Sequence, residues 1–136
     1  MLAEVMELVV GRRFAQQSAV LAGYRRRLLR GAVYPAIVPA ASESVRGVLF
    51  EGLDLPALAR LDRFEGALYA RPELRVAVAM GESCSAFVYV LRPEHHSLAT
   101  DALWDEAEFR ARHMRDYLVA CRAFVRELAE GTSVGA

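Results

Sequence analysis

The stretch Leu61-Asp62-Arg63-Phe64-Glu65-Gly66-Ala67-Leu68-Tyr69 joins the end of a predicted helix to the start of a predicted strand. It places one carboxylate, Glu65, between an aromatic residue and a glycine. A carboxyl group that is partly desolvated there, and still reachable, can have its pKa raised from about 4.3 toward neutrality and can then transfer protons. Glu65 is therefore the candidate catalytic residue, although spacing alone favours a surface charge at a helix end.

The same stretch contains a second carboxylate, Asp62, three residues before Glu65. If both residues lie on a helix, their side chains share one face and can be read as a pair. Asp62 also lies next to Arg60 and Arg63, so it can instead cap the helix or form a local ion pair. Both interpretations of Asp62 stay open at this point.

The residues on either side of this stretch predict a short helix and a hairpin. Over Leu53–Phe64 the apolar residues recur at every third position, namely Leu55, Leu58, Leu61 and Phe64. Pro56 is tolerated in the first turn of this helix because its missing N–H has no helical partner there. Leu68–Met80 and Cys84–Leu91 are rich in β-forming residues, and a turn near Gly81-Glu82 joins them as in a hairpin.

Three β-rich runs precede this helix, over residues 18–29, 32–38 and 44–50. Gly23 predicts a bulge or a close approach of chains in the first run. Pro35 cannot donate to a ladder of hydrogen bonds, so the second run is expected at a sheet edge or in an irregular strand. Together, Gly23, Gly47 and Gly66 would allow the strands to curve.

Helices are predicted at both ends of the chain. Residues 2–10 carry apolar side chains at helical spacing and are followed by Gly11, a typical helix stop. Asp105, followed three residues later by a glutamate, has the spacing of a capping box, and a long apolar stripe continues over residues 109–128. This last helix is expected to end before residues 131–136, which would form a frayed tail.

The order of these elements is not the strict alternation of strand and helix that is typical of a parallel sheet. We therefore predict an α+β fold, a small mixed or antiparallel β-barrel flanked by helices. The chain of 136 residues fits a single domain, 1–136, because no repeat, low-complexity segment or linker divides it.

Composition argues against several classes of partner. Lys+Arg and Asp+Glu are equal at 17 each, so the overall charge offers no argument for nucleic acid or an anionic membrane. No apolar run approaches the ~20 residues of a membrane span. Cys84 and Cys121 lie far apart without metal-ligand spacing and are expected to be buried free thiols. We expect a cytoplasmic protein with a small-molecule partner, no nucleic acid and no membrane.

Four clustered arginines, Arg25, Arg26, Arg27 and Arg30, could bind phosphate or nucleic acid. Because alternate residues of a strand face opposite sides, their charge would be divided between two faces, and a solvated sheet face is the favoured interpretation. His95-His96 lacks a third ligand at suitable spacing, so a metal site is poorly supported. Neither a phosphate-binding glycine loop nor a dinucleotide fingerprint is present.

Four segments of the chain together carry a resemblance to a known family. They are Val33-Tyr34-Pro35-Ala36-Ile37, Val45-Arg46-Gly47-Val48-Leu49, Leu61-Asp62-Arg63-Phe64-Glu65-Gly66 with Tyr69 and Arg71, and Ala86-Phe87-Val88-Tyr89-Val90. The pattern resembles the γ-glutamylcyclotransferase-like family, which includes γ-glutamylamine cyclotransferases and the plant avirulence-induced-gene-like (AIG2-like) proteins. The resemblance extends from about Met1 to the C-terminal helix. It implies a small β-barrel flanked by helices, with a cavity for a γ-glutamyl group.

The resemblance also implies a reaction that needs no metal or cofactor. The substrate's α-amine attacks its own γ-carbonyl, which closes 5-oxoproline and releases an amine or amino acid. The glutamate of the family's Phe-Glu-Gly motif falls on Glu65 and would carry the proton from the attacking to the leaving nitrogen. Tyr34, Tyr69, Arg71 and Tyr89 are the further candidates to line the cavity and bind substrate; for Tyr69 and Tyr89, packing within the barrel is the favoured alternative.

The chain departs from the family pattern at its start. Family members open with a strand ending in Tyr-Gly-Ser/Thr-Leu, whose backbone N–H groups cradle the substrate. Met1-Leu2 stands about where that motif ends, so the first strand and most of the loop are expected to be missing. Either the true start codon lies upstream, or this is a shortened relative that no longer catalyses. The second alternative predicts a binding or interaction module, with a homodimer or partner covering the bare sheet edge.

Overall fold

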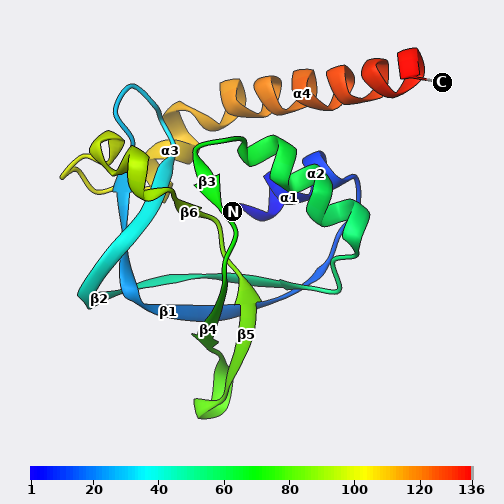
Figure 1. The fold of residues 1–136 in the computed structure, drawn as a ribbon. Coiled ribbons are helices and arrows are strands. Elements are labelled where there is room, and N and C mark those ends of the chain that lie inside the picture. Colours follow the sequence, from blue (N-terminus) through cyan, green and yellow to red (C-terminus); the bar gives the residue numbers. More distant parts are fainter. Residues whose placement is uncertain (136) are drawn as a thin grey trace.

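The structure, a computed structural model, describes the backbone of residues 1–135 and the side chains of residues 1–130. Its helices are α1 (Ala3–Val10), α2 (Leu55–Glu65), α3 (Glu106–Arg112) and α4 (Met114–Gly135), with 3-10 turns at Ala79–Gly81 and Pro93–Leu98. Its strands are β1 (Ala15–Leu28), β2 (Pro35–Glu51), β3 (Tyr69–Ala70), β4 (Glu73–Ala77), β5 (Ser83–Phe87) and β6 (Val90–Leu91). One antiparallel sheet has the order β2-β1-β4-β5, and β3 pairs with β6 in a separate two-stranded sheet. Helices α1, α2 and α4 lie on the same side of β1 and β2 (Figure 1).

β1 and β2 pair along most of their length in one long, bent ribbon (Figure 1). The register of the ribbon shifts between Ala22 and Tyr24, and Gly23 between them has a φ of 83°. A positive φ is readily adopted by glycine, so the predicted bulge at Gly23 is confirmed. Gly47 lies opposite Ala19 in regular pairing.

The two β-rich runs predicted at residues 32–38 and 44–50 belong to one continuous strand, β2. The strand passes through residues 40–43, which lie opposite the bulge of β1 and carry no β-forming pattern of their own. Pro35 is the first residue of β2, and β2 is an edge of its sheet. The edge position expected for this proline is therefore confirmed.

The predicted hairpin is present, but each of its arms is broken into two strands. β4 pairs with β5 from Glu73↔Phe87 to Ala77↔Ser83, and β3 pairs with β6 next to the break. Pro72 lies at the break between β3 and β4 and has no N–H to donate to a ladder. Met80 was expected in a strand, but it lies in the turn with a φ of 62° and is 96% exposed.

Helix α2 is capped by Asp54, which directly precedes its first residue. The carboxylate of Asp54 accepts a hydrogen bond from the N–H of Ala57 at 3.0 Å, and Pro56 lies in the first turn. The predicted apolar face is wrong at Leu55, which is 81% exposed. Three residues turn a helix by about 300°, so every third position drifts around it, and Leu61 lies about 120° away from Leu55. The buried face of α2 is instead formed by Ala57 and Leu61.

The main core lies where α1, α2 and α4 meet. Its buried residues are Val5, Met6, Val9, Leu61 and Cys121. The predicted helix over residues 2–10 is confirmed as α1, and Gly11 ends it in the left-handed conformation. Cys121 is buried and Cys84 is partly buried, and both are free thiols. Because Leu61 belongs to this core, the helix that carries Glu65 is anchored to it.

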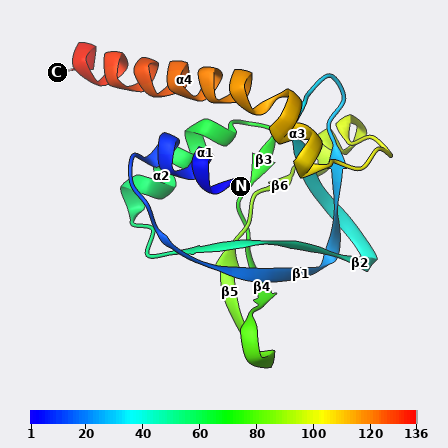
Figure 2. The ribbon, with the colours of Figure 1, turned by 180° about the vertical axis from the view of Figure 1, so that it is seen from behind.

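The predicted C-terminal helix is two helices, α3 and α4, which meet at His113. Asp105 caps α3 as predicted, since its carboxylate accepts a hydrogen bond from the N–H of Glu108 at 3.0 Å. Helix α4 continues to Gly135, so it does not end before the tail expected over 131–136; residue 136 lies outside the described backbone. The far end of α4 projects beyond the sheet in both views (Figures 1 and 2).

The predicted α+β class with an antiparallel sheet is confirmed, while the barrel is open. β2 and β5 are the two edges of the four-stranded sheet and do not pair with each other, and β3 and β6 form their own pair. The bent ribbon and the hairpin therefore form a trough rather than a closed cylinder. Within the described residues, no helix has the length and apolar character needed to cross a membrane.

Candidate active site

A cavity of about 1060 Å³ opens between the sheet and the helices. Residues from helices α1 to α4 and from strands β1 to β5 line it. Most of the lining is apolar. Its polar and aromatic side chains include Arg26, Tyr34, Glu65, Tyr69, Trp104 and Tyr117. A mostly apolar hollow with a few polar groups is typical of a small-molecule site.

Glu65 is the last residue of α2, and its backbone is fixed by the residue that follows it. Gly66 has φ 81° and ψ −167°, a conformation that is essentially restricted to glycine, and its N–H donates to the carbonyl of Asp62 at 3.0 Å. The conformation of Gly66 therefore ends the helix directly after Glu65. Leu61, one turn earlier, anchors the same helix to the core.

The carboxyl group of Glu65 is partly buried and has no hydrogen bond or ion pair among the described residues. Burial raises its pKa from 4.5 to about 7, and the nearby amino group of Met1 opposes this shift. The desolvated environment expected for Glu65 is therefore present. A carboxyl group with a pKa near neutrality can both accept and donate a proton at physiological pH.

Three tyrosines gather around Glu65. Burial raises the pKa of Tyr69, and the charge of Glu65 raises it further. Burial also raises the pKa of Tyr117, with smaller contributions from Cys121 and Glu65. The rings of Tyr34 and Tyr117 lie 5.9 Å apart between centroids, and Tyr34 is 37% exposed. Tyr69 and Tyr117 therefore stay neutral and can serve as hydrogen-bond donors beside the carboxylate.

Arg71 and Tyr89 bind Asp62 instead of reaching freely into the cavity. Arg71 donates to both carboxylate oxygens of Asp62, at 2.8 and 3.1 Å, and the hydroxyl of Tyr89 donates to Oδ1 at 2.5 Å. The guanidinium of Arg71 also lies 4.5 Å from the ring centroid of Phe87. Arg71 and Tyr89 line the cavity and also a second, small pocket that Asp62 and Tyr69 line. Asp62 therefore pairs across the fold and not with its sequence neighbours.

The two carboxylates of α2 consequently have opposite properties. The hydrogen bond from Arg71 holds the pKa of Asp62 below its usual value, and Tyr89 contributes to this shift. Burial raises the pKa of Glu65, three residues later. Environments that separate the pKa values of neighbouring acids are characteristic of sites in which one acid stays ionised and the other transfers protons.

The arginine cluster is divided between two directions, as the strand alternation predicted. Arg25 lies 3.7 Å from the carboxylate of Glu43, and Arg27 donates to the carbonyl of Asp101 at 3.4 Å. Arg26 alone of the four lines the cavity, with its guanidinium 5.6 Å from the ring centroid of Trp104.

Sequence reasoning did not single out Trp104 or Tyr117 as site residues, and it considered Arg26 only as one of four clustered arginines that could bind phosphate or nucleic acid. Tyr117 was read as part of an apolar stripe, and the fold alone brings the other two together. Within the described residues, no group of three His, Cys, Asp or Glu side chains is placed to hold a metal ion.

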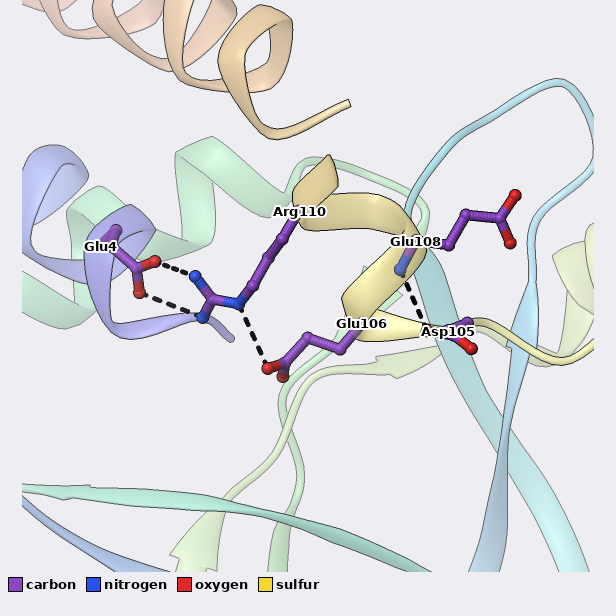
Figure 3. Close-up of polar contacts among 5 residues, drawn as sticks. All are labelled: Glu4, Asp105, Glu106, Glu108 and Arg110. Carbon is purple, nitrogen blue, oxygen red and sulfur yellow. Dashed lines mark hydrogen bonds and ion pairs between the residues drawn. The ribbon is translucent and has the colours of Figure 1, made fainter. Parts of the chain in front are cut away.

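An ion-pair network links α1 to α3 beside the cavity (Figure 3). Arg110 of α3 pairs with Glu4 of α1 through both carboxylate oxygens and with Glu106 of its own helix at 3.2 Å. The hydrogen bond from Arg110 lowers the pKa of Glu4. Glu4, Glu106 and Arg110 all line the cavity. The network therefore joins α1 to α3 in the wall of the cavity.

Comparison with known proteins places this arrangement in a family. Residues 1–109 match the family described as gamma-glutamyl cyclotransferase, AIG2-like. The chain is 30% identical to AIG2-like protein D of Arabidopsis thaliana over 92% of its own length and 83% of that protein. It is also 30% identical to AIG2-like protein C of the same plant, over 90% of this chain and 71% of that protein.

Solved structures agree with this match. One solution structure of an Arabidopsis thaliana protein is 26% identical and has a TM-score of 0.63, with 98% of this chain and 78% of that protein covered. A second, 24% identical, has a TM-score of 0.65 over 87% of this chain and 79% of that protein, and it supports the fold alone. The chain belongs to the gamma-glutamyl cyclotransferase, AIG2-like family.

Proposed function

We propose that this protein cyclises a γ-glutamyl group to 5-oxoproline and releases an amine or amino acid, with Glu65 as general acid and base. The observation that carries the proposal is the state of Glu65. Its carboxyl group lies unpaired and partly buried in a cavity, with a pKa of about 7, in a chain that belongs to this family. Such a group can hold a proton for the short time between its removal and its return.

The reaction needs one proton carrier and no external nucleophile. The α-amine of the substrate attacks the γ-carbonyl carbon, and a C–N bond forms that closes a five-membered ring. Glu65 takes the proton that the attacking nitrogen loses. When the tetrahedral intermediate collapses, the bond to the leaving nitrogen breaks, and Glu65 returns the proton to that nitrogen. Since the attack is intramolecular, folding the substrate into a reactive pose supplies much of the rate.

The neighbouring tyrosines suit the charge that develops during this reaction. The γ-carbonyl oxygen becomes an oxyanion, which hydrogen-bond donors stabilise. Burial keeps Tyr69 in its neutral, donating form by raising its pKa. We assign Tyr69 as a donor to the oxyanion, with Tyr34 contacting the substrate beside it. Arg71 and Tyr89 shape the rim of the cavity through their bonds to Asp62.

Substitution of Glu65 tests this proposal. Glu65→Gln keeps the size of the side chain and removes its proton transfer, so 5-oxoproline release from γ-glutamyl amines should fall by about 10²–10⁴-fold. The matched control is Glu82→Gln, because Glu82 is an exposed carboxylate in the hairpin turn and does not line the cavity. Release of 5-oxoproline should be measured by chromatography across several γ-glutamyl amines and γ-glutamyl amino acids.

Two results would contradict the proposal. One is a Glu65→Gln protein that releases 5-oxoproline as fast as the unaltered chain. The other is an unaltered chain that binds γ-glutamyl compounds and releases no 5-oxoproline from any of them, since this result would instead indicate a binding module on the same fold.

A further inference from the structure

Arg26 is a cation in the cavity for which the fold provides no carboxylate partner. Its Nη2 donates to the backbone carbonyl of Arg46 at 2.9 Å, and its guanidinium lies against the ring of Trp104. No Asp or Glu oxygen of the described residues lies within the 4.0 Å of an ion pair with it. Glu106 acts on Arg26 only at longer range, through its charge. The remaining hydrogen-bond donors of the guanidinium are therefore available.

The other arginines of the cavity wall are engaged or face outward. Arg71 binds both oxygens of Asp62, and Arg110 binds Glu4 and Glu106. Arg46 is exposed on β2, next to Val45, whose strand partner Leu21 is buried. Because neighbouring residues of a strand face opposite sides, the side chain of Arg46 points away from the interior. Arg26 is the cavity arginine that can accept an anionic ligand.

The bulge of β1 explains why Arg26 reaches the cavity at all. Leu21 lines the same cavity, and regular alternation would put residues 21 and 26 on opposite faces because they are five positions apart. The register shift at Gly23 lies between them and breaks this alternation. Arg25 and Arg27, which pair with Val38 and Ala36, do not line the cavity.

Arg26 and Glu65 both line this cavity. The amino group of Met1 lies within electrostatic reach of both side chains: Glu65 raises the pKa of that amine and Arg26 lowers it, while burial has the largest effect and also lowers it. Any γ-glutamyl compound that brings its α-amine to Glu65 brings its α-carboxylate, attached to the same carbon, into this region. A guanidinium that stacks on an aromatic ring and has free donors is well suited to a carboxylate.

We infer that Arg26 binds the free α-carboxylate of the substrate and so restricts the site to γ-glutamyl compounds in which that carboxylate is not blocked, an inference that rests on the function proposed above. Free γ-glutamyl amines and γ-glutamyl amino acids meet this requirement. A γ-glutamyl residue at the amino terminus of a polypeptide does not, because it keeps its α-amine but its α-carboxyl group is part of a peptide bond.

Two substrates that differ only at this group test the inference. They are γ-L-glutamyl-n-butylamide and its analogue with an α-carboxamide in place of the α-carboxylate. Both release butylamine by the same ring closure, so one assay follows both. The unaltered protein should prefer the carboxylate substrate by about 10- to 100-fold in kcat/KM, as expected for the loss of a charge-assisted pair. Arg26→Gln should remove most of this preference through a higher KM for the carboxylate substrate.

Control variants separate recognition of the carboxylate from general damage to the fold. Arg26→Lys keeps the charge and should retain part of the preference. Arg30→Gln removes an exposed arginine that does not line the cavity and should behave as the unaltered protein does. If Arg26→Gln does not fold, the two-substrate comparison on the unaltered protein and on Arg26→Lys still decides the question.

The outcomes distinguish this inference from the proposed function. Butylamine release from both substrates at equal kcat/KM, or an Arg26→Gln protein that keeps the full preference, would overturn the role of Arg26 and leave the cyclisation proposal standing. Release from neither substrate would overturn the proposed function and, with it, the inference.

Discussion

At the scale of single residues, the environment of Glu65 determines the behaviour of the site. The sequence predicted its position at a helix end, between Phe64 and Gly66. It also led us to expect that the carboxyl group is partly desolvated. The structure has that environment: the carboxyl group lies in the cavity and burial raises its pKa to about 7. The catalytic role of Glu65 stays a prediction.

The raised pKa of Glu65 predicts a cost in stability at neutral and alkaline pH. The folded-state pKa of about 7 lies above the usual value of 4.5, so the folded chain favours protonated Glu65. The resulting stabilisation is complete below pH 4.5 and is lost as the pH rises through 7. Glu65→Gln, which never ionises, should therefore raise the free energy of unfolding by about 2–3 kcal/mol at pH 8 and hardly change it at pH 4.

Urea unfolding at both pH values measures this difference. Asp62→Asn is a control, because its effect on the free energy of unfolding should have the opposite sign. The pKa of Asp62 is lowered by Arg71, so its stabilisation is present at neutral pH and is lost in acid. Asp62→Asn should destabilise the protein at pH 8, by only about 1 kcal/mol because this ion pair is half exposed and screened by solvent. A Glu65→Gln protein that is equally stable or less stable than the unaltered chain at pH 8 would show that Glu65 is not desolvated.

Arg26, Trp104 and Tyr117 could not be identified as site residues from the sequence. The direction of Arg26 depends on the bulge at Gly23, and alternation alone does not reveal how a strand continues after an irregularity. Trp104 and Tyr117 come from segments far from Glu65 along the chain. Only the folded arrangement brings their side chains to the same cavity.

At the scale of elements, local signals predicted the starts of helices better than the lengths of strands. The start of α3 was read correctly from its cap Asp105, and the start of α2 from Pro56 in its first turn, because both signals are local. The continuity of β2 could not be read, because residues 40–43 carry no β-forming pattern and only the pairing with β1 on either side of them shows one strand.

The junction between α2 and β3 depends on one glycine. Gly66 has a backbone conformation that residues other than glycine rarely adopt. A Cβ at this position would meet no atom within 4 Å. Gly66→Ala should therefore cost about 1–3 kcal/mol of stability from backbone strain alone. Since Glu65 directly precedes it, the same change should displace the carboxyl group and lower 5-oxoproline release by about 10- to 100-fold.

Gly47→Ala is the matched control for this experiment. Gly47 pairs regularly with Ala19, does not have a positive φ, and also has open space around its Cα. Its substitution should change stability by no more than about 0.5 kcal/mol, as is usual away from strained or buried positions. Thermal melts and steady-state rates of the two variants, measured together, compare the sites. Equal effects at both glycines would contradict the role assigned to the conformation of Gly66.

At the scale of the whole molecule, the open trough of strands and the helices above it create the site together. The sequence predicted an α+β fold with an antiparallel sheet, and this is confirmed. It did not predict that the strands leave the barrel open, because strand pairing is a long-range property. The cavity wall combines both ends of the chain: Glu4 near the start is held by Arg110 near the last helix.

The pH dependence of 5-oxoproline release tests the central claim most directly, because it reports on the chemistry and on the environment of Glu65 at once. Glu65 must be ionised in the free protein to accept a proton, and kcat/KM reports the free protein. With a pKa of about 7, kcat/KM should fall roughly tenfold for each pH unit below 7. A kcat/KM that stays level down to pH 5 would contradict the account, because a general base at this site would then have an ordinary pKa.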